Sequence, residues 1–478
     1  MPPRGGRGHA ADDERRATNH ERRGDPVETT SDAARRRRTA RDAAVAAAVR
    51  QGLLGAAEPL VGLLDVDGLL DTVAKLHAAF APAPVRHAFA AKACALAPVM
   101  RLMADAGMDC EVASPGELRL ALAAGFPPER IVYDSPIKTV AELEFALAHG
   151  IALNVDNFQE LARVDALLAG GPAPAPLGIR VNPQVGRGSV DSTSTATATS
   201  KFGVALRDEG ATEAVVQAFV RHPWLTRIHT HVGSLGCPLS LMAEGVAAAH
   251  ALAERVNAET GQRRVTGLDI GGGLPVNFAD DTDTPTFADY VAELRRAVPT
   301  LFDGRYDLIT EFGRSIFAKN GTVASIVEYT KTTGGRRIAV THAGGQILTR
   351  AMSMPEAWPI RIDAFDAKGR PKSGPTEPHD IAGPLCFAGD LSAIARDLPV
   401  LEPGDILALH DTGAYSLSTH FSYNSLPRPA IHGYRTTPTS ETTFTPIRPA
   451  QTLTEVLTDS GTTHIESLTT TTQRISPS

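Results

Sequence analysis

The chain has 478 residues and a formal net charge of -7 at pH 7, so it exceeds one typical domain and does not favour nucleic acid as its main partner. Hydrophobic residues make up 42% and charged residues 21%, so a sizeable core can form, and no stretch is long enough to span a bilayer. Four cysteines without CxxC pairing predict reduced thiols, no metal site and a cytoplasmic location.

The first part of the chain divides into two predicted segments. Residues 1–45 are rich in charged residues, glycine and proline, and we expect a disordered N-terminal tail there. The run Arg35 to Arg38 is interpreted as a solvated stretch rather than a nucleic-acid patch, because no aromatic residues interleave it. Within residues 46–75, the strand-like run Leu60 to Leu64 is expected to pack with a later β domain.

Residues 76–318 alternate between short apolar runs and alanine- and leucine-rich helical stretches. There are eight strand-like runs, and their last residues are Ala93, Ser114, Ser135, Asp156, Pro183, Ser234, Gly273 and Ser315. Eight alternations over roughly 250 residues predict a (β/α)8 barrel of the TIM type. A doubly wound open sheet shares the alternation and is the alternative fold.

The remaining segments differ in composition. A Ser/Thr-rich stretch between Gly186 and Ser200 predicts a surface loop after the fifth strand, near the site. Residues 319–435 combine strand-like runs with glycine and proline punctuation, which predicts a mostly β C-terminal domain. Residues 436–478 are dominated by serine and threonine, and we expect a second loose tail.

Polar residues close several of the predicted strands, at the end where barrels place their active sites. Lys92 ends an otherwise apolar run, and a desolvated lysine can form a Schiff base with an aldehyde. Gly271 to Gly273 can expose backbone N–H groups to a phosphate, and Ser234, just after His231, adds a hydroxyl. Glu311 can keep a pyridine nitrogen protonated. These residue types together indicate an active site.

The motifs around these residues resemble those of pyridoxal-phosphate-dependent decarboxylases of the ornithine and diaminopimelate type. The matching segments are AAKACAL, EVASPGEL, YDSPIKT, HVGS, DIGGGLP, EFGRS, GPLCFAGD and DTGAYS, in the family's order over roughly residues 60–430. The resemblance implies a fold-type III enzyme with the barrel of alanine racemase, and pyridoxal 5'-phosphate as its cofactor.

Residue by residue, the resemblance implies how the cofactor is held. Lys92 matches the lysine that binds the aldehyde, and His231 matches the imidazole that stacks on the ring. Glu311 matches the carboxylate that faces the pyridine nitrogen. The phosphate contacts match a larger set: Ser234, Gly271, Gly272, Gly273, Gly313, Arg314 and Tyr415.

The resemblance also implies the reaction and the assembly. Lys92 and Cys386 would be the catalytic residues of an amino-acid decarboxylase, with Cys386 supplied by the neighbouring subunit of a homodimer to protonate the carbanion. Arg180 and Glu117 match barrel positions that support the site. The alternative for Cys386 is a buried structural thiol, which its motif disfavours.

The predicted substrate pocket departs from the family. Phe387 stands where relatives carry an acid after the motif cysteine, and His342 aligns with a second aspartate of ornithine-type members. Each lost carboxylate removes charge-assisted hydrogen bonds to a distal ammonium, worth roughly 1.5–3 kcal/mol. Ornithine and lysine are therefore disfavoured as substrates.

Two arginines of the family's substrate pocket are retained in this chain. Arg314 and Arg350 match two arginines that diaminopimelate-type members use for a distal carboxylate, whereas Met354 and Ala388 replace a tyrosine and a serine. The predicted substrate-binding residues are Arg314, Arg350, Phe387 and Tyr415. Diaminopimelate is harder to exclude than ornithine and lysine, because its distal end also carries a carboxylate. We hypothesise a diaminopimelate-decarboxylase-like enzyme whose altered pocket takes an amino acid with a less basic, larger or carboxylated side chain, as in specialised metabolism.

Three other functions use similar parts. An amino-acid racemase or epimerase shares the barrel and lysine but needs a second acid–base residue, usually a tyrosine, on the other face of the cofactor. A non-catalytic protein that binds pyridoxal phosphate resembles the barrel alone. A degenerate regulatory subunit is compatible with Phe387 and His342, although it would not need Lys92.

Overall fold

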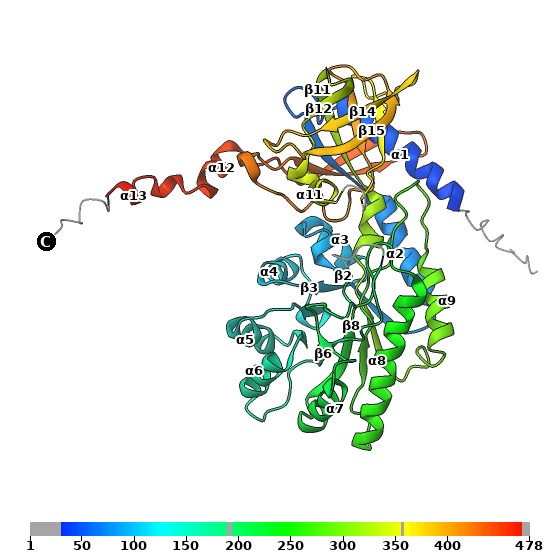
Figure 1. The fold of residues 1–478 in the computed structure, drawn as a ribbon, viewed down its shortest axis with the longest axis vertical. Helices are drawn as coiled ribbons and strands as arrows, with labels where there is room; N and C mark the ends of the chain where they lie inside the picture. Colours follow the sequence, from blue (N-terminus) through cyan, green and yellow to red (C-terminus); the bar gives the residue numbers. More distant parts are fainter. Residues whose placement is uncertain (1–29, 189–193, 355–357, 471–478) are drawn as a thin grey trace, which may run out of the picture.

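The protein consists of a barrel and a β-rich domain that covers one end of it (Figure 1). The computed structural model describes residues 30–188, 194–354 and 358–470. Strand-forming runs of the barrel are buried along almost their whole length, as expected for parallel strands covered by helices. Among the described helices, none combines the length and apolar character needed to cross a membrane.

Eight parallel strands close into the predicted barrel. The order of pairing is β5-β4-β3-β2-β10-β9-β8-β6, and a β5–β6 pairing completes the ring. This confirms the barrel and excludes the open sheet. The strands are β2 (Val85–Ala90), β3 (Asp109–Val112), β4 (Ile131–Asp134), β5 (Ala152–Val155), β6 (Leu177–Asn182), β8 (Leu225–Thr230), β9 (Gly267–Asp269) and β10 (Asp307–Thr310), with a short β7 (Val204–Ala205) beside β6.

Helices surround the barrel, and polar caps fix where several of them begin. Ser114 and Asn157 accept backbone N–H groups of the first helical turn, and Thr139 and Thr286 form capping boxes. The helices are α2 (Val66–Phe80), α3 (Ala97–Asp105), α4 (Pro115–Ala123), α5 (Val140–Ala148), α6 (Phe158–Leu168), α7 (Ala211–Arg221), α8 (Leu239–Thr260), α9 (Phe287–Ala297) and α10 (Arg314–Phe317), with turns η1 (Ala91–Ala93), η2 (Pro128–Arg130) and η4 (Ala318–Asn320).

The β domain is built around a strand that precedes the barrel in sequence. As expected for the run Leu60 to Leu64, β1 (Leu60–Asp65) lies between an antiparallel and a parallel neighbour, β11 and β17. The other elements are β11 (Gly321–Thr333), β12 (Arg336–Thr341), α11 (Gly345–Ser353), β13 (Ile362–Phe365), β14 (Thr376–Ala382), β15 (Leu391–Pro399), β16 (Ile406–Leu409), η5 (Tyr423–Ser425), β17 (Ala430–Thr436) and β18 (Thr442–Arg448).

The expectation of a disordered tail through residue 45 is wrong for residues 30–45. They form most of helix α1 (Thr30–Arg50), whose alanine and valine side chains are buried against the β domain, Ala44 and Val45 among them. Alanine is the best helix former, so a segment poor in large apolar residues still folds where a partner surface exists. Residues 1–29 lie outside the described part.

The expected loose tail at residues 436–478 also differs. Strand β18 pairs antiparallel with β17, and α12 (Leu453–Asp459), η6 (Thr462–His464) and α13 (Ser467–Thr470) extend away from the body in Figure 1. The threonine-rich run forms a strand because β-branched residues suit the pleated surface. Residues 471–478 lie outside the described part.

The expected loop after the fifth barrel strand, at residues 186–200, touches the site in its described portion. Thr195 Oγ1 donates a 2.6 Å hydrogen bond to the His231 carbonyl. Residues 189–193 lie outside the description.

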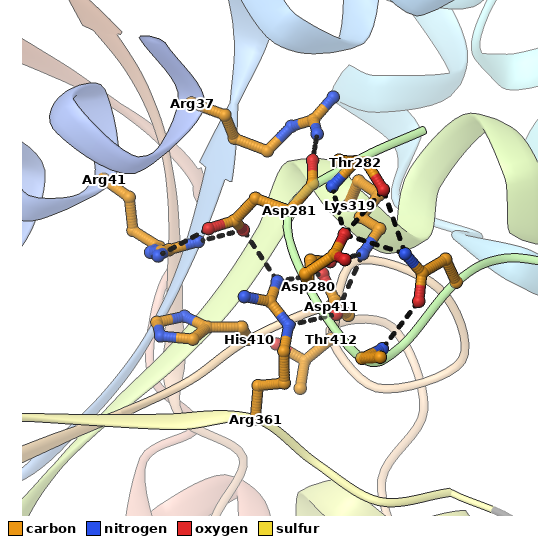
Figure 2. A network of polar contacts seen from close by, with 12 residues as sticks. Arg37, Arg41, Asp280, Asp281, Thr282, Lys319, Arg361, His410, Asp411 and Thr412 are labelled. Atoms are coloured by element: carbon orange, nitrogen blue, oxygen red, sulfur yellow. Dashed lines mark hydrogen bonds and ion pairs between the residues drawn. The ribbon is translucent and has the colours of Figure 1, made fainter. Parts of the chain in front are cut away.

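An ionic network joins α1, the loop after β9 and the β domain (Figure 2). Asp281 lies at its centre and contacts Arg41 and Arg361 at 2.8 and 2.7 Å. Arg361 also binds Asp411 at 3.0 Å, and Lys319 binds the same carboxylate at 3.3 Å. Burial works to raise the pKa of Asp281, but Arg41 and Arg361 hold that pKa well below its ordinary value. The network fixes the two domains relative to each other.

Candidate active site

Lys92 lies in the η1 turn directly after β2, at the carboxyl end of the barrel strands. Its Nζ contacts Glu111, which β3 supplies, at 3.1 and 3.3 Å. The Lys92 side chain keeps 42% of its surface exposed, while Glu111 is fully buried. Burial raises the pKa of Glu111 to about 8, against the opposing effect of the lysine. The amine is therefore accessible from the barrel mouth and anchored from below.

Glu311 follows β10 and lies in the floor of the site with 2% of its surface exposed. His229 Nε2 on β8 lies 3.3 Å from a Glu311 oxygen, and His229 Nδ1 lies 3.4 Å from Asp134, which also pairs with Arg180 at 3.0 Å. Neither carboxylate oxygen of Glu311 accepts a hydrogen bond of good geometry from a described residue. A buried carboxylate in that state is suited to a donor that enters the barrel mouth.

These neighbours keep Glu311 ionised. Burial works to raise its pKa, but His229 and His231 hold the pKa of Glu311 well below its ordinary value. For His229, burial opposes the charge, yet Asp134 and Glu311 raise its pKa well above its ordinary value. The chain Arg180–Asp134–His229–Glu311 thus alternates positive and negative charge beneath the site, which stabilises each member.

His231 lies beside Glu311 but remains neutral near pH 7, because burial lowers its pKa to about 4. Its Nδ1 accepts a 3.3 Å hydrogen bond from the Gly272 N–H and lies 3.7 Å from Glu311. Among the described residues, His229, His231 and Glu311 also form one group that could ligate a metal, with ligand atoms within 4.8 Å. The expectation of no metal site stays a prediction.

Three glycines after β9 bring the backbone close to neighbouring strand ends. Gly271 and Gly273 have φ values of +66° and +89°, which favour glycine. A Cβ on Gly272 would collide with the Glu311 carbonyl, and one on Gly273 would lie 2.6 Å from the Gly233 backbone. On Gly313, a Cβ would lie 3.0 Å from that of Ala93. Side chains larger than hydrogen cannot occupy this rim, so a ligand can approach its backbone closely. The Gly271 and Gly272 N–H groups themselves donate to Asp269 and His231.

Tyr415 connects the β domain to the lysine turn. Its N–H donates a 2.8 Å hydrogen bond to the Ala93 carbonyl, and its φ of +63° is a strained value for tyrosine. The guanidinium carbon of Arg350 on α11 lies 3.7 Å from the centre of the Tyr415 ring, and that of Arg314 lies 5.1 Å from it. The structure therefore brings Tyr415, Arg314 and Arg350 together beside Lys92.

Arg314 reaches from this cluster to the predicted phosphate side. Its Nη2 donates a long hydrogen bond of 3.5 Å to the Ser234 hydroxyl, and its guanidinium stacks on Trp358 at 4.3 Å. Burial lowers the pKa of Arg314 to about 10, and it remains charged at neutral pH. Neither Arg314 nor Arg350 has an ion pair with an acid in the described part of the chain.

Cys386 and Phe387 lie apart from this cluster, on the loop between β14 and β15. The Cys386 N–H donates to Asn424 at 2.8 Å, and Tyr423 donates to the Cys386 carbonyl at 3.3 Å. Cys386 is exposed, which contradicts the buried structural thiol, and Phe387 keeps 54% of its surface exposed. Within the described part of the chain, the hydrogen bonds of Cys386 are to Asn424 and Tyr423, and none joins it to Lys92.

His342 is also outside the cluster around Lys92. Its Nε2 pairs with Glu328 at 3.0 Å, and it lines a cavity of 290 Å³ with Gln346, Pro384 and Arg428. The expected supporting residues behave differently from one another: Arg180 joins the charge chain, while Glu117 accepts the Ala113 N–H at 2.8 Å and caps α4.

Sequence reasoning missed four members of the site: Glu111, Asp134, His229 and Trp358. The first three are polar residues inside short apolar strands, within the motifs EVAS, YDSP and HTHVGS. A buried ionisable residue at a strand end is a signal of function, and it could have identified them. Trp358 follows a segment without such a pattern.

Comparisons with known proteins agree with this geometry. Residues 68–318 match the family model for the pyridoxal binding domain of pyridoxal-dependent decarboxylases. The chain is 33% identical over 346 residues to the diaminopimelate decarboxylase of Methanothermobacter thermautotrophicus, covering 72% of this chain and 78% of that protein. It is 32% identical over 345 residues to the diaminopimelate decarboxylase of Pseudomonas aeruginosa, covering 72% and 79%.

Solved structures of amino-acid decarboxylases also superpose on this chain. The diaminopimelate decarboxylase of Helicobacter pylori complexed with L-lysine superposes with a TM-score of 0.74 at 25% identity, covering 84% of this chain and 96% of that one. A lysine/ornithine decarboxylase of Vibrio vulnificus complexed with putrescine has a TM-score of 0.68 at 24% identity, which shows the shared fold.

Proposed function

Because the chain belongs to the pyridoxal-dependent decarboxylase family and is an amino-acid carboxy-lyase, we propose that it binds pyridoxal 5'-phosphate on Lys92 and acts on a substrate without a distal ammonium. One observation carries this: an accessible lysine and a buried, ionised glutamate, whose oxygens accept no well-aligned hydrogen bond from a described residue, face the same barrel mouth.

The residues present fit the cofactor. The oxygens of Glu311, which accept no well-aligned hydrogen bond within the described residues, suit the protonated ring nitrogen of a pyridine. The rim of Gly271 to Gly273, with the Ser234 hydroxyl and Arg314, suits a phosphate, because a side chain at Gly272 or Gly273 would collide with neighbouring backbone. His231, neutral and beside Glu311, suits stacking on a ring.

The residues of the chain divide the work of decarboxylation. When bound, pyridoxal phosphate supplies an electron sink for the pair released as the α-carboxylate leaves. Glu311 keeps its negative charge through His229 and so holds the proton on the ring nitrogen. Lys92 provides the amine that anchors the aldehyde and later releases the product, and Glu111 beneath it can take or give a proton at Nζ.

A proton must return to the α-carbon, and we assign this step to Cys386 of a second subunit. Two features support the assignment: Cys386 is exposed, and aromatic residues Phe387, Phe421 and Tyr423 around it are 54%, 43% and 43% exposed. Exposed aromatic side chains of this density are typical of interfaces. The protein is thus proposed to be a homodimer with shared sites. Four free cysteines support a cytoplasmic location.

The distal pocket defines the substrate class. Phe387 cannot accept a hydrogen bond from an ammonium, and His342 already pairs with Glu328. Two guanidinium groups, those of Arg314 and Arg350, lie beside Tyr415 instead, and neither pairs with an acid in the portion of the chain that the structure describes. This balance favours a side chain that is uncharged or carboxylated over one ending in an amine, and it supports a role in specialised metabolism.

The first test measures cofactor and substrate together. Purified protein loaded with pyridoxal phosphate should absorb as an imine, and borohydride should then attach the cofactor to Lys92 but leave Lys92→Ala unmodified. Among a panel of amino acids, carboxylated and neutral side chains should release CO2 faster than ornithine and lysine. A strong preference for ornithine would reject the proposed pocket, and absence of labelling would reject the lysine.

The second test addresses the shared site. Lys92→Ala and Cys386→Ala should each be nearly inactive alone. Equimolar mixing after dissociation should restore about a quarter of the wild-type activity, because half of the dimers combine the two variants and each has one intact site. Activity that stays at the level of the separate variants would show that Cys386 serves its own chain or no site.

A further inference from the structure

Trp358 is an unassigned member of the distal pocket. Its indole is 9% exposed and packs edge-on against Phe278, with ring centres 5.6 Å apart. The guanidinium carbons of Arg314 and Arg350 lie 4.3 and 5.7 Å from its ring. Both cations therefore contact the indole of Trp358, and both also lie over the ring of Tyr415.

The indole N–H of Trp358 has no hydrogen-bond partner among the described residues, and neither has Nη1 of Arg314. A buried donor without a partner destabilises a fold, and tryptophan usually finds a partner when buried. The second buried donor belongs to a guanidinium whose carbon lies 4.3 Å from the Trp358 ring and which has no ion pair with an acid among the described residues. Both donors would be satisfied by one carboxylate.

The same residues line a small cavity. Its volume is about 40 Å³, and Arg314, Arg350, Trp358 and Leu348 contribute to its wall. That volume accommodates about two or three non-hydrogen atoms, the size of a carboxylate group. Asp411 also lines it, but both oxygens of Asp411 already contact Arg361 and Lys319. The wall therefore keeps a net positive character.

We propose that Trp358 is a specificity-determining residue that selects amino acids whose side chain ends in a carboxylate. Its N–H donates to that carboxylate, and its ring positions Arg314 to bind the same group. This inference rests on the proposed function and narrows its substrate class. It assigns to Trp358 a contribution separate from that of the two arginines.

The two tryptophans of the chain make a direct test possible. Trp224 lies just before β8, at the opposite end of the barrel strands, and donates to Asp165 at 3.1 Å. In Trp224→Phe, Trp358 is therefore the only indole. Titrating the cofactor-loaded variant with glutarate, adipate or pimelate should change its fluorescence saturably, whereas 1,5-diaminopentane should not. Equal or tighter binding of the diamine would overturn the proposal.

A second measurement separates hydrogen bonding from packing. Trp358→Phe keeps an aromatic face and loses the N–H, so the Kd for the best dicarboxylate, measured by calorimetry, should rise about tenfold. Trp358→His, which keeps a ring donor, should recover part of that loss. For a carboxylated substrate KM should rise about as much, with kcat within about twofold. Norleucine should show no change in KM.

Two outcomes would count against Trp358 alone. Equal dicarboxylate affinity in wild type and Trp358→Phe would reduce its role to packing. A parallel loss of kcat for all substrates would indicate a general structural effect. Because the fluorescence and calorimetric readouts need no turnover, failure of the proposed decarboxylation would appear separately, as missing CO2 release with intact dicarboxylate binding.

Discussion

The domain junction and the barrel mouth both gather buried charge, but they arrange it differently. At the junction, Asp281 lies between Arg41 and Arg361, and Asp411 between Arg361 and Lys319, so each carboxylate is matched inside the chain (Figure 2). At the mouth, Glu311 and Arg314 keep buried polar atoms without hydrogen-bond partners in the described structure.

The difference teaches how one fold uses the same residue types for two purposes. Matched charges hold α1 and the β domain against the barrel, because removing either partner exposes the other to an apolar surrounding. Unmatched donors and acceptors are tolerated where a ligand satisfies them, and they mark the site. Mutations at the two places should therefore affect different measurements.

The largest effect is expected at Glu311. Glu311→Gln removes the negative charge that holds the ring nitrogen protonated, and kcat for CO2 release should fall about 100- to 1000-fold. Glu259→Gln, on the outer face of α8, is the matched control and should retain full activity. A loss of less than about threefold for Glu311→Gln would contradict the assigned role.

Asp281→Asn should show the reverse pattern. It leaves Arg41 and Arg361 without their shared carboxylate, which should cost about 3 kcal/mol and lower Tm by about 3 °C. Differential scanning calorimetry would measure this, with kcat at 25 °C close to wild type. If activity fell and Tm did not, the junction and the mouth would not be independent.

Glu111→Gln should change the pH dependence of stability. Its carboxyl titrates near 4.5 when unfolded and near 8 in the fold, so the folded protein binds a proton that the unfolded chain has lost. Stability therefore falls as pH rises from about 4.5 to 8, by about 1.4 kcal/mol per pH unit for this group. The Tm of cofactor-free Glu111→Gln should decline less over this range than that of wild type or exposed Glu144→Gln. Parallel curves would contradict the raised pKa.

The smallest effect is expected for Asp283→Asn. Asp283 pairs with Arg37 at 2.9 Å at the margin of the network and keeps 32% of its side chain exposed. Water screens this pair, so the loss should be below about 1 kcal/mol. Calorimetry beside Asp281→Asn gives the comparison directly. An equal loss of Tm for both variants would show that position within the network does not matter.

Much of the barrel was predictable from sequence because its strands are short and buried and alternate with capped helices. The β1 strand was also predictable, because a short apolar run such as Leu60 to Leu64 is typical of a buried strand. Helix α1 was not, because Ala44 and Val45 are buried by a surface that forms far along the chain, and Arg41 pairs with Asp281 240 residues away. Local composition contains no trace of such partners.

The candidate site divides along the same line. Lys92, Glu311 and the glycines lie in recognisable sequence motifs and could be predicted. Trp358 lies in no such motif, and only its contacts with the two guanidinium groups in the folded protein indicate a role. His229 is part of the segment HTHVGS, but the sequence does not predict its contacts with Asp134 and Glu311, because these form only when the strands close into a barrel. Residues defined by three-dimensional neighbours require the fold.

The position of β1 has a consequence for biosynthesis. The ribosome makes this strand before the barrel, yet both strands that flank it, β11 and β17, are made afterwards. The barrel is thus an insertion within the other domain, and the C-terminal sheet can be completed only when almost the entire polypeptide has emerged. A gene split after residue 318 would separate β1 from both neighbours, so a self-sufficient second half must carry residues 60–65 grafted onto it.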